Sequence, residues 1–198
     1  MFNGVLIKNY APPAVDKREI LRYAGVRGEA DGQTLALLDE CLAACADELS
    51  YRVCYRALPV SHSLFQTGEG VKARLVGCEG VTVFAATVGL ELDRLIAKYA
   101  RVSVAKALLL QAIGTERIES LCGEFCKDLA RENADLFFGT RFSPGYGDFP
   151  LSAQRELFAL LDCPRKIGLT LNENLLMTPT KSVTAAVGFG KRELRDEF

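Results

Sequence analysis

The chain has 198 residues, which is the size of one domain or slightly more. Its 24 Lys and Arg residues nearly balance 25 Asp and Glu residues, so the formal net charge of -1 gives no reason to expect binding to nucleic acid or to an anionic membrane. Hydrophobic residues make up 49% of the chain, enough for a substantial core, which excludes global disorder. No apolar stretch approaches the ~20 residues that span a bilayer, and residues 1–10 lack a secretory signal pattern, so we expect a cytoplasmic globular protein.

The amino-terminal part predicts one strand followed by two helices. Residues 4–8 are typical of a short strand, which two prolines close directly afterwards. Asp16 and Glu19 have the spacing of a capping box and predict a helix that ends near Gly25. Leucines at three- to four-residue spacing predict a second helix over residues 34–49.

Beyond residue 50 the hydrophobic period changes from helical to alternating. Residues 51–56 alternate as a half-buried strand does, and residues 71–76 and 81–86 are interpreted as a strand pair around a glycine turn. Amphipathic patterns then predict a group of three helices, over residues 89–99, 104–112 and 115–131.

The carboxy-terminal part returns to strands after a loop over residues 141–150. Ser152 is expected to cap a short helix that Pro164 ends, and residues 168–171 and 182–189 are expected to be strands around a polar segment. Strands at both ends with helices in the middle predict an α+β fold. The chain has no G-x-G-x-x-G after a strand and no P-loop motif, so Rossmann and P-loop nucleotide sites have no support.

Seven cysteines need an explanation. Their odd number argues against a disulfide framework. The chain has no Cys-x-x-Cys and only one histidine, His62, so we expect no zinc site. Cys41 with Cys45, and Cys122 with Cys126, are each four residues apart on one face of a predicted helix. We interpret them as small apolar residues packed in a reducing cytosol, with a thiol-based redox role as the alternative.

The segment RFSPGYGDFP, residues 141–150, is the part of the chain that favours chemistry. Its glycines allow positive φ and close approach of a ligand, and Pro144 restricts Ser143 to an extended backbone. Arg141 could bind a carboxylate bidentately, and the Tyr146 ring could face a cation or a flat base. An ordinary turn with Arg141 in a surface ion pair fits the composition equally well.

The segment from Arg141 to Tyr146 resembles the R-x-x-P-G-Y motif of the activation domain of cobalamin-dependent methionine synthase, the module of that enzyme that binds S-adenosylmethionine. Three further stretches are similar and stand in the same order: residues 84–89 with the helix that follows, the apolar helix over 112–125, and residues 171–183, which resemble L-T-E-S-x-x-M-x-P-x-x-S-V. The resemblance to this family covers roughly residues 81–189. Residues 1–80 diverge and look like the stand-alone form of the domain.

This resemblance implies a single activation-domain-like unit over residues 1–198. Its α+β fold would have a twisted, mainly antiparallel sheet with a central group of helices. The implied function is reductive reactivation, by S-adenosylmethionine-dependent remethylation, of the cob(II)alamin form of a corrinoid-dependent methionine synthase that lacks its own activation domain. The chain would be a separate subunit and a methyltransferase component. The cobalamin would be carried by the partner, and flavodoxin or ferredoxin would donate the electron.

The resemblance also implies which side chains bind the cofactor. Arg141 would bind the carboxylate of S-adenosylmethionine, and Tyr146 would lie near the sulfonium and the corrinoid face. Glu119 would accept hydrogen bonds from the ribose or the amino group. A shift of one residue would exchange Glu119 for Ser120, and a solvated helical carboxylate is the alternative interpretation of Glu119. Positioning and exclusion of water would suffice, so we expect neither a catalytic side chain nor a metal ligand.

Backbone groups complete the implied site. Phe142 and Ser143 would offer backbone groups to the adenine edge, and Gly145 would permit the turn. Gly147 stands where the family usually has proline, which predicts a more flexible loop. Four residues are expected to shape the strand behind the site rather than to touch the ligand: Met177, Pro179, Ser182 and Val183.

Two other functions remain open on these residues. One is a non-catalytic module that binds and caps or chaperones a corrinoid protein. The other is a reactivator of a different corrinoid methyltransferase, such as one acting on methylamines or methoxy compounds. Methyl transfer from S-adenosylmethionine would exclude the first, and neighbouring genes would separate the second from the methionine synthase partner.

Overall fold

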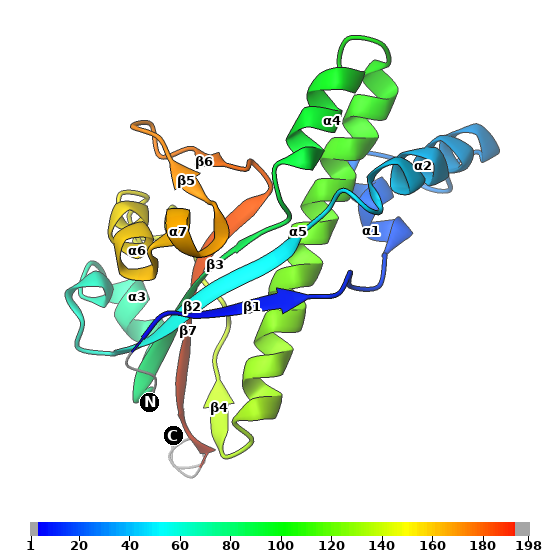
Figure 1. Ribbon diagram of the computed structural model, residues 1–198. Helices are drawn as coiled ribbons and strands as arrows, with labels where there is room; N and C mark the ends of the chain where they lie inside the picture. Colours follow the sequence, from blue (N-terminus) through cyan, green and yellow to red (C-terminus); the bar gives the residue numbers. More distant parts are fainter. Residues whose placement is uncertain (1–3, 193–198) are drawn as a thin grey trace.

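The computed structural model describes residues 4–192, and its centre is a five-stranded sheet in which all neighbouring strands are antiparallel (Figure 1). The strand order is β1-β2-β3-β7-β4, so the last strand in the chain lies between β3 and β4. A separate two-stranded hairpin, β5 with β6, precedes β7. The predicted α+β fold with a twisted antiparallel sheet is confirmed. The bounds are β1 (Leu6–Tyr10), β2 (Tyr51–Pro59), β3 (Gly80–Thr87), β4 (Leu136–Phe138), β5 (Thr170–Leu171), β6 (Met177–Thr178) and β7 (Ser182–Lys191).

Helices cover both faces of this sheet and divide the core in two. On one face α1, α2, α4 and the long α5 pack against it, and on the other lie α3, α6 and α7 (Figure 1). All eight residues of β3 are buried because both of its faces are covered. No helix within residues 4–192 combines the length and the apolar character needed to cross a membrane. The bounds are α1 (Lys17–Tyr23), α2 (Gly32–Cys45), α3 (Glu69–Arg74), α4 (Glu91–Tyr99), α5 (Val104–Glu132), α6 (Ala153–Leu161) and α7 (Cys163–Ile167).

The cap predicted for the first helix is present in part. The Asp16 carboxylate accepts hydrogen bonds from the backbone N–H groups of Arg18 and Glu19, 3.0 and 3.1 Å away. Glu19 does not complete the capping box, because its carboxylate binds Arg22. The Asp16 N–H is instead bonded to Glu116 Oε1 on α5, at 3.3 Å. A tertiary contact thus takes the place of the local one.

The strand predicted over residues 71–76 is wrong. Residues Glu69–Arg74 form α3, whose Val71 is buried in the core beneath α6. A short apolar run fits a strand and a buried helical turn equally well. The helix is stabilised from a distance: Asp148 accepts from the N–H groups of Gly70 and Val71 at 2.6 and 3.1 Å. The local sequence therefore could not settle which structure forms.

The helices predicted over residues 104–112 and 115–131 are one continuous helix, α5. Gly114 does not interrupt it. A Cβ atom at Gly114 would lie 2.5 Å from Leu92 Cδ2 and 2.8 Å from Lys181 Cγ, so glycine lets α4 and the segment before β7 approach α5 closely. The glycine marks a packing contact rather than a helix end.

Smaller differences fall at the ends of elements. The helix predicted over residues 34–49 ends at Cys45, and Ser152 stands at the start of α6 without capping it through its side chain. Pro164 lies in the first turn of α7 instead of ending α6. The short strand β4, which pairs with the end of β7, was not predicted because three residues give no measurable alternation.

Candidate functional site

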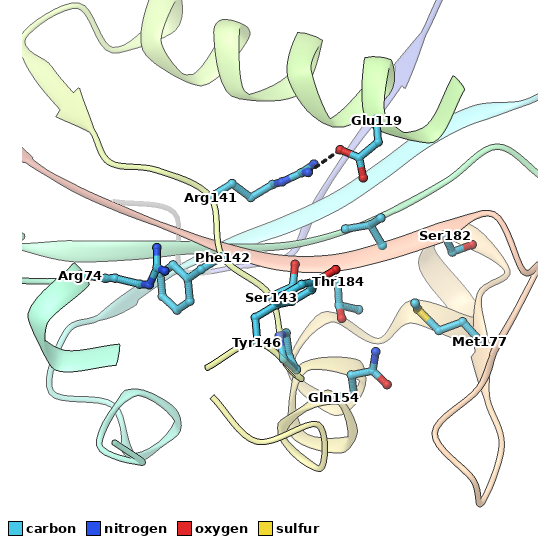
Figure 2. Close-up of a pocket in the computed structure, with 12 residues that line it drawn as sticks. Arg74, Glu119, Arg141, Phe142, Ser143, Tyr146, Gln154, Met177, Ser182 and Thr184 are labelled. Atoms are coloured by element: carbon cyan, nitrogen blue, oxygen red, sulfur yellow. Dashed lines mark hydrogen bonds and ion pairs between the residues drawn. The ribbon is translucent and has the colours of Figure 1, made fainter. Parts of the chain in front are cut away.

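A cavity of about 410 Å³ lies against the edge of β7 (Figure 2). The loop that follows β4 forms one wall, and α5, α6 and β6 contribute the others. β4 pairs only with residues 189–191 of β7, so the first residues of β7 have no strand neighbour on this side. The cavity is lined by Arg74, Glu119, Arg141, Phe142, Ser143, Pro144, Tyr146, Gln154, Met177, Ser182, Val183 and Thr184.

The loop is held to the sheet at its first residues. Phe142 and Ala186 exchange both backbone hydrogen bonds, at 3.0 and 2.8 Å. The Phe142 ring packs on Phe149, with ring centroids 5.6 Å apart. The chain then turns with φ of +93° at Gly145 and +58° at Gly147. A proline at position 147 could not adopt that positive φ.

The far end of the loop is fixed by Asp148. Its carboxylate receives the two N–H groups at the start of α3, and a Cβ at Gly68 would lie 2.2 Å from Asp148 Oδ2. The loop is therefore tied to β7 at one end and to α3 at the other. This arrangement presents the Arg141 side chain to α5 and leaves Tyr146 at the rim, with 75% of its surface exposed.

Arg141 meets Glu119 across the cavity. Arg141 Nη2 lies 2.5 Å from Glu119 Oε2, and the two side chains are 27% and 42% exposed (Figure 2). A guanidinium has five N–H donors, so this pair leaves donors for a second carboxylate. Ser120, the alternative to Glu119, donates its hydroxyl to Glu116 at 2.7 Å and does not line the cavity. Glu119 is therefore the residue that faces Arg141.

Two of the cysteines lie close to this pair on α5. Burial raises the pKa of the Cys122 thiol to about 12, and burial also raises the pKa of Cys126. A thiol with a raised pKa is neutral at physiological pH and a poor nucleophile. Five of the seven cysteines are buried in the two cores, which favours packing over redox chemistry as their role: Cys41, Cys45, Cys54, Cys122 and Cys163.

The structure brings the predicted site residues together. Five of the six line one cavity, and Gly145, the sixth, forms the turn between them. One detail differs from expectation: both backbone groups of Phe142 are engaged with Ala186, so its N–H is not available to a ligand. Ser143 keeps an N–H that no backbone carbonyl receives within residues 4–192.

Several lining residues were not predicted as contacts. Met177, Ser182 and Val183 face the cavity rather than lying behind it. Gln154 and Thr184 were missed entirely, although a polar residue inside the apolar run of β7 is a signal that could have found Thr184. Arg74, the last residue of α3, places its guanidinium 6.0 Å from the centre of the Phe142 ring. His62 lies beyond the end of β2 and is not among the residues that line the cavity.

Comparisons with known proteins gave one matching family model and a similar fold. A family model described as "Vitamin B12 dependent methionine synthase, activation domain" matches residues 74–195. A solved structure titled "Crystal Structure of the MetH Reactivation Domain bound to AdoHcy" is similar with a TM-score of 0.65 and 16% identity, over 93% of this chain and 78% of that one. A search of curated protein sequences gave no match. Since the family model covers more than half of the residues, the chain belongs to the activation domain family of vitamin B12-dependent methionine synthase.

Proposed function

We propose that this chain binds S-adenosylmethionine in the cavity beside β7 and serves as a cytoplasmic reactivation subunit for a corrinoid-dependent methionine synthase. In this proposal the 198 residues act as one unit and the partner carries the cobalamin. The observation that carries it is the cavity lined by the Arg141–Glu119 pair, in a chain of this family. The similar solved structure, whose title names AdoHcy as its ligand, supports the choice of methyl donor.

The residues present fit S-adenosylmethionine. A volume of about 410 Å³ falls within the ~300–1,000 Å³ typical of small-molecule sites. The free donors of Arg141 would bind the carboxylate of the methionine end, and Glu119 would accept from its ammonium group or from the ribose. The carboxylate and ammonium groups of the ligand would thus each face a side chain of opposite charge.

The chain's own contribution is placement. The loop, tied to β7 at Ala186 and through Asp148 to α3, would hold the sulfonium near the rim, where the exposed Tyr146 ring would meet the corrinoid face of the partner. Docking would exclude water from the transfer, with no acid or base required. The partner's corrinoid, reduced by flavodoxin or ferredoxin, would supply the acceptor for the methyl group, and the cavity would be left holding S-adenosylhomocysteine.

Calorimetric titration with S-adenosylmethionine tests the binding step. Arg141→Ala should weaken binding about 100-fold, because a charge-assisted bidentate contact is lost. Arg131→Ala is the matched control, since Arg131 is an exposed arginine paired within α5 and away from the cavity. Absence of binding by the unaltered chain, both with and without a corrinoid partner, would refute the proposal.

The transfer step has its own test. Anaerobic incubation with the partner, a low-potential reductant and S-adenosylmethionine should convert the cob(II)alamin absorbance to that of methylcobalamin. Complex formation without this conversion would instead support the non-catalytic capping role.

A further inference from the structure

Two buried polar side chains of the cavity have no hydrogen-bond partner. Gln154 Oε1 and Thr184 Oγ1 bond to no atom in the part of the chain that the structure describes, although the two residues are only 6% and 2% exposed. Buried polar atoms are nearly always paired, because an unpaired one loses its bonds to water without replacement. Two such atoms in the lining of one cavity indicate a ligand group that pairs with them.

The backbone of Thr184 adds to this subsite. Ala186, two residues further along β7, directs its N–H and C=O away from β3 toward Phe142. Residues two apart in a strand direct these groups to the same side, so those of Thr184 also point to the open edge of β7. Side chain and backbone of Thr184 therefore both offer neutral hydrogen-bonding groups at the cavity.

The two ends of the cavity differ in charge. Arg141 and Glu119 form the end next to α5, whereas Gln154, Thr184 and Met177 gather at the end next to α6 (Figure 2). The α6 end holds a carboxamide, a hydroxyl and a thioether, none of which carries a charge. It suits an uncharged, flat group with its own donors and acceptors, while the α5 end suits a zwitterion.

We propose that Gln154, assisted by Thr184, recognises the adenine base and makes the site selective for it. The carboxamide oxygen of Gln154 accepts from the exocyclic amine of adenine, and its NH₂ group donates to the ring nitrogen N7. Glutamine pairs with these two atoms of adenine in a bidentate geometry, and rotation of the amide brings either of its polar atoms to the ligand. This inference rests on the proposed function, because it assigns the base of the same S-adenosyl ligand.

Titrations with two ligands test the assignment. S-adenosylhomocysteine carries the exocyclic amine, and S-inosylhomocysteine carries a carbonyl oxygen there, which would face Gln154 Oε1. The unaltered chain should prefer the adenine ligand 10- to 100-fold. In Gln154→Met that preference should fall below threefold, mainly through weaker binding of the adenine ligand. Thr184→Val should weaken the binding of S-adenosylhomocysteine about threefold.

Melting temperatures show whether a variant loses affinity because it loses a ligand contact or because its fold is less stable. Both variants remove a buried unpaired atom, so each should melt at or above the temperature of the unaltered chain. Gln111→Met, at an exposed glutamine of α5, is the matched control and should keep the preference for adenine. A lower melting temperature for both variants would overturn the inference by showing that the two side chains support the fold.

The remaining outcomes separate the two proposals. If the unaltered chain binds S-adenosylhomocysteine and Gln154→Met keeps the full preference for adenine, the assignment of Gln154 is wrong and the proposed function stands. If the unaltered chain binds neither ligand nor S-adenosylmethionine, the proposed function fails and this inference fails with it.

Discussion

Glu116 and Glu119 are three residues apart on α5, and each pairs with an arginine, but the two pairs have opposite roles. Glu116 and Arg117 form the first pair, with Arg117 Nε 2.5 Å from Glu116 Oε2 and both side chains at most 3% exposed. Glu119 and Arg141 form the second pair, which is partly exposed and lines the cavity. The same two residue types thus form a structural contact in one pair and line a candidate binding site in the other.

Saturation of hydrogen bonds distinguishes the two pairs. Arg117 also donates to the carbonyl oxygens of Pro13 and Ala14, at 2.7 and 2.8 Å, and so holds the segment before α1 to α5. Glu116 additionally accepts from Asp16 N–H and from the Ser120 hydroxyl. Removing one partner of a buried pair whose hydrogen bonds are used within the protein should destabilise the fold, whereas a half-exposed pair with spare donors can receive a ligand.

The largest effect is expected at the buried pair. Arg117→Met should lower the free energy of unfolding by about 3–5 kcal/mol, because it leaves the Glu116 carboxylate buried without a counter-charge. Urea unfolding at neutral pH measures this loss. The double variant Glu116→Gln/Arg117→Met should recover part of it, and a loss below ~1 kcal/mol in the single variant would contradict a structural role.

A smaller effect, mainly on ligand affinity, is expected at the partly exposed Glu119–Arg141 pair. Glu119→Gln should change the free energy of unfolding by less than ~1 kcal/mol, since a half-exposed ion pair contributes little. The affinity for S-adenosylmethionine should fall about 10-fold, because a charge-assisted contact to the ligand is lost. Parallel urea and calorimetric titrations separate the two quantities, with Glu124→Gln on the same helix as control. A large loss of stability with unchanged affinity would show that the Glu119–Arg141 pair supports the fold instead of binding the ligand.

The smallest effect concerns a third cluster, at the far end of α5. Lys8 Nζ lies 2.7 Å from Asp128 Oδ2 and 2.5 Å from Glu132 Oε1, tying β1 to the helix. The hydrogen bond from Lys8 holds the pKa of Asp128 below its usual value of 3.8. A carboxyl with a lowered pKa stabilises the fold above pH 3.8, and this contribution is lost as the pH falls through the lower, folded-state pKa.

The unfolding free energies of the unaltered chain and Asp128→Asn should therefore differ by less than ~1 kcal/mol at pH 6, and the difference should shrink as the pH falls below 3.8. Added salt should reduce the difference at pH 6, because the cluster is partly exposed. A difference in unfolding free energy that persists unchanged at pH 2.5 would show that the charge of Asp128 does not cause it.

Local patterns predicted much of the fold and most of the site. The apolar spacing of α2, α4 and α5, the alternation of β2 and the cap at Asp16 are properties of neighbouring residues, so they could be recognised without a structure. The loop motif from Arg141 to Tyr146 predicted the cavity because its residues are consecutive. The fold class is confirmed by the structure, and the roles of the site residues stay predictions.

Contacts between distant residues account for what was missed. Asp148 stabilises α3 from 77 residues away in sequence, and Gly114 sits inside α5 because Leu92 packs against it. The backbone of Phe142 is engaged by Ala186, which moves any recognition of adenine toward side chains. None of these partners can be read from the residues next to the affected one.

The amino-acid sequence alone determined the family, the class of fold and the loop that carries Arg141, because these depend on short motifs and on hydrophobic period. Tertiary structure decided which glutamate faces that arginine and which helix holds the other end of the loop. It also placed Gln154 and Thr184 in the lining of one cavity, each with a polar atom that no group within residues 4–192 pairs. The physical reason is that burial and hydrogen-bond saturation are set by elements far apart in the chain, and these two properties distinguish a ligand site from a structural contact.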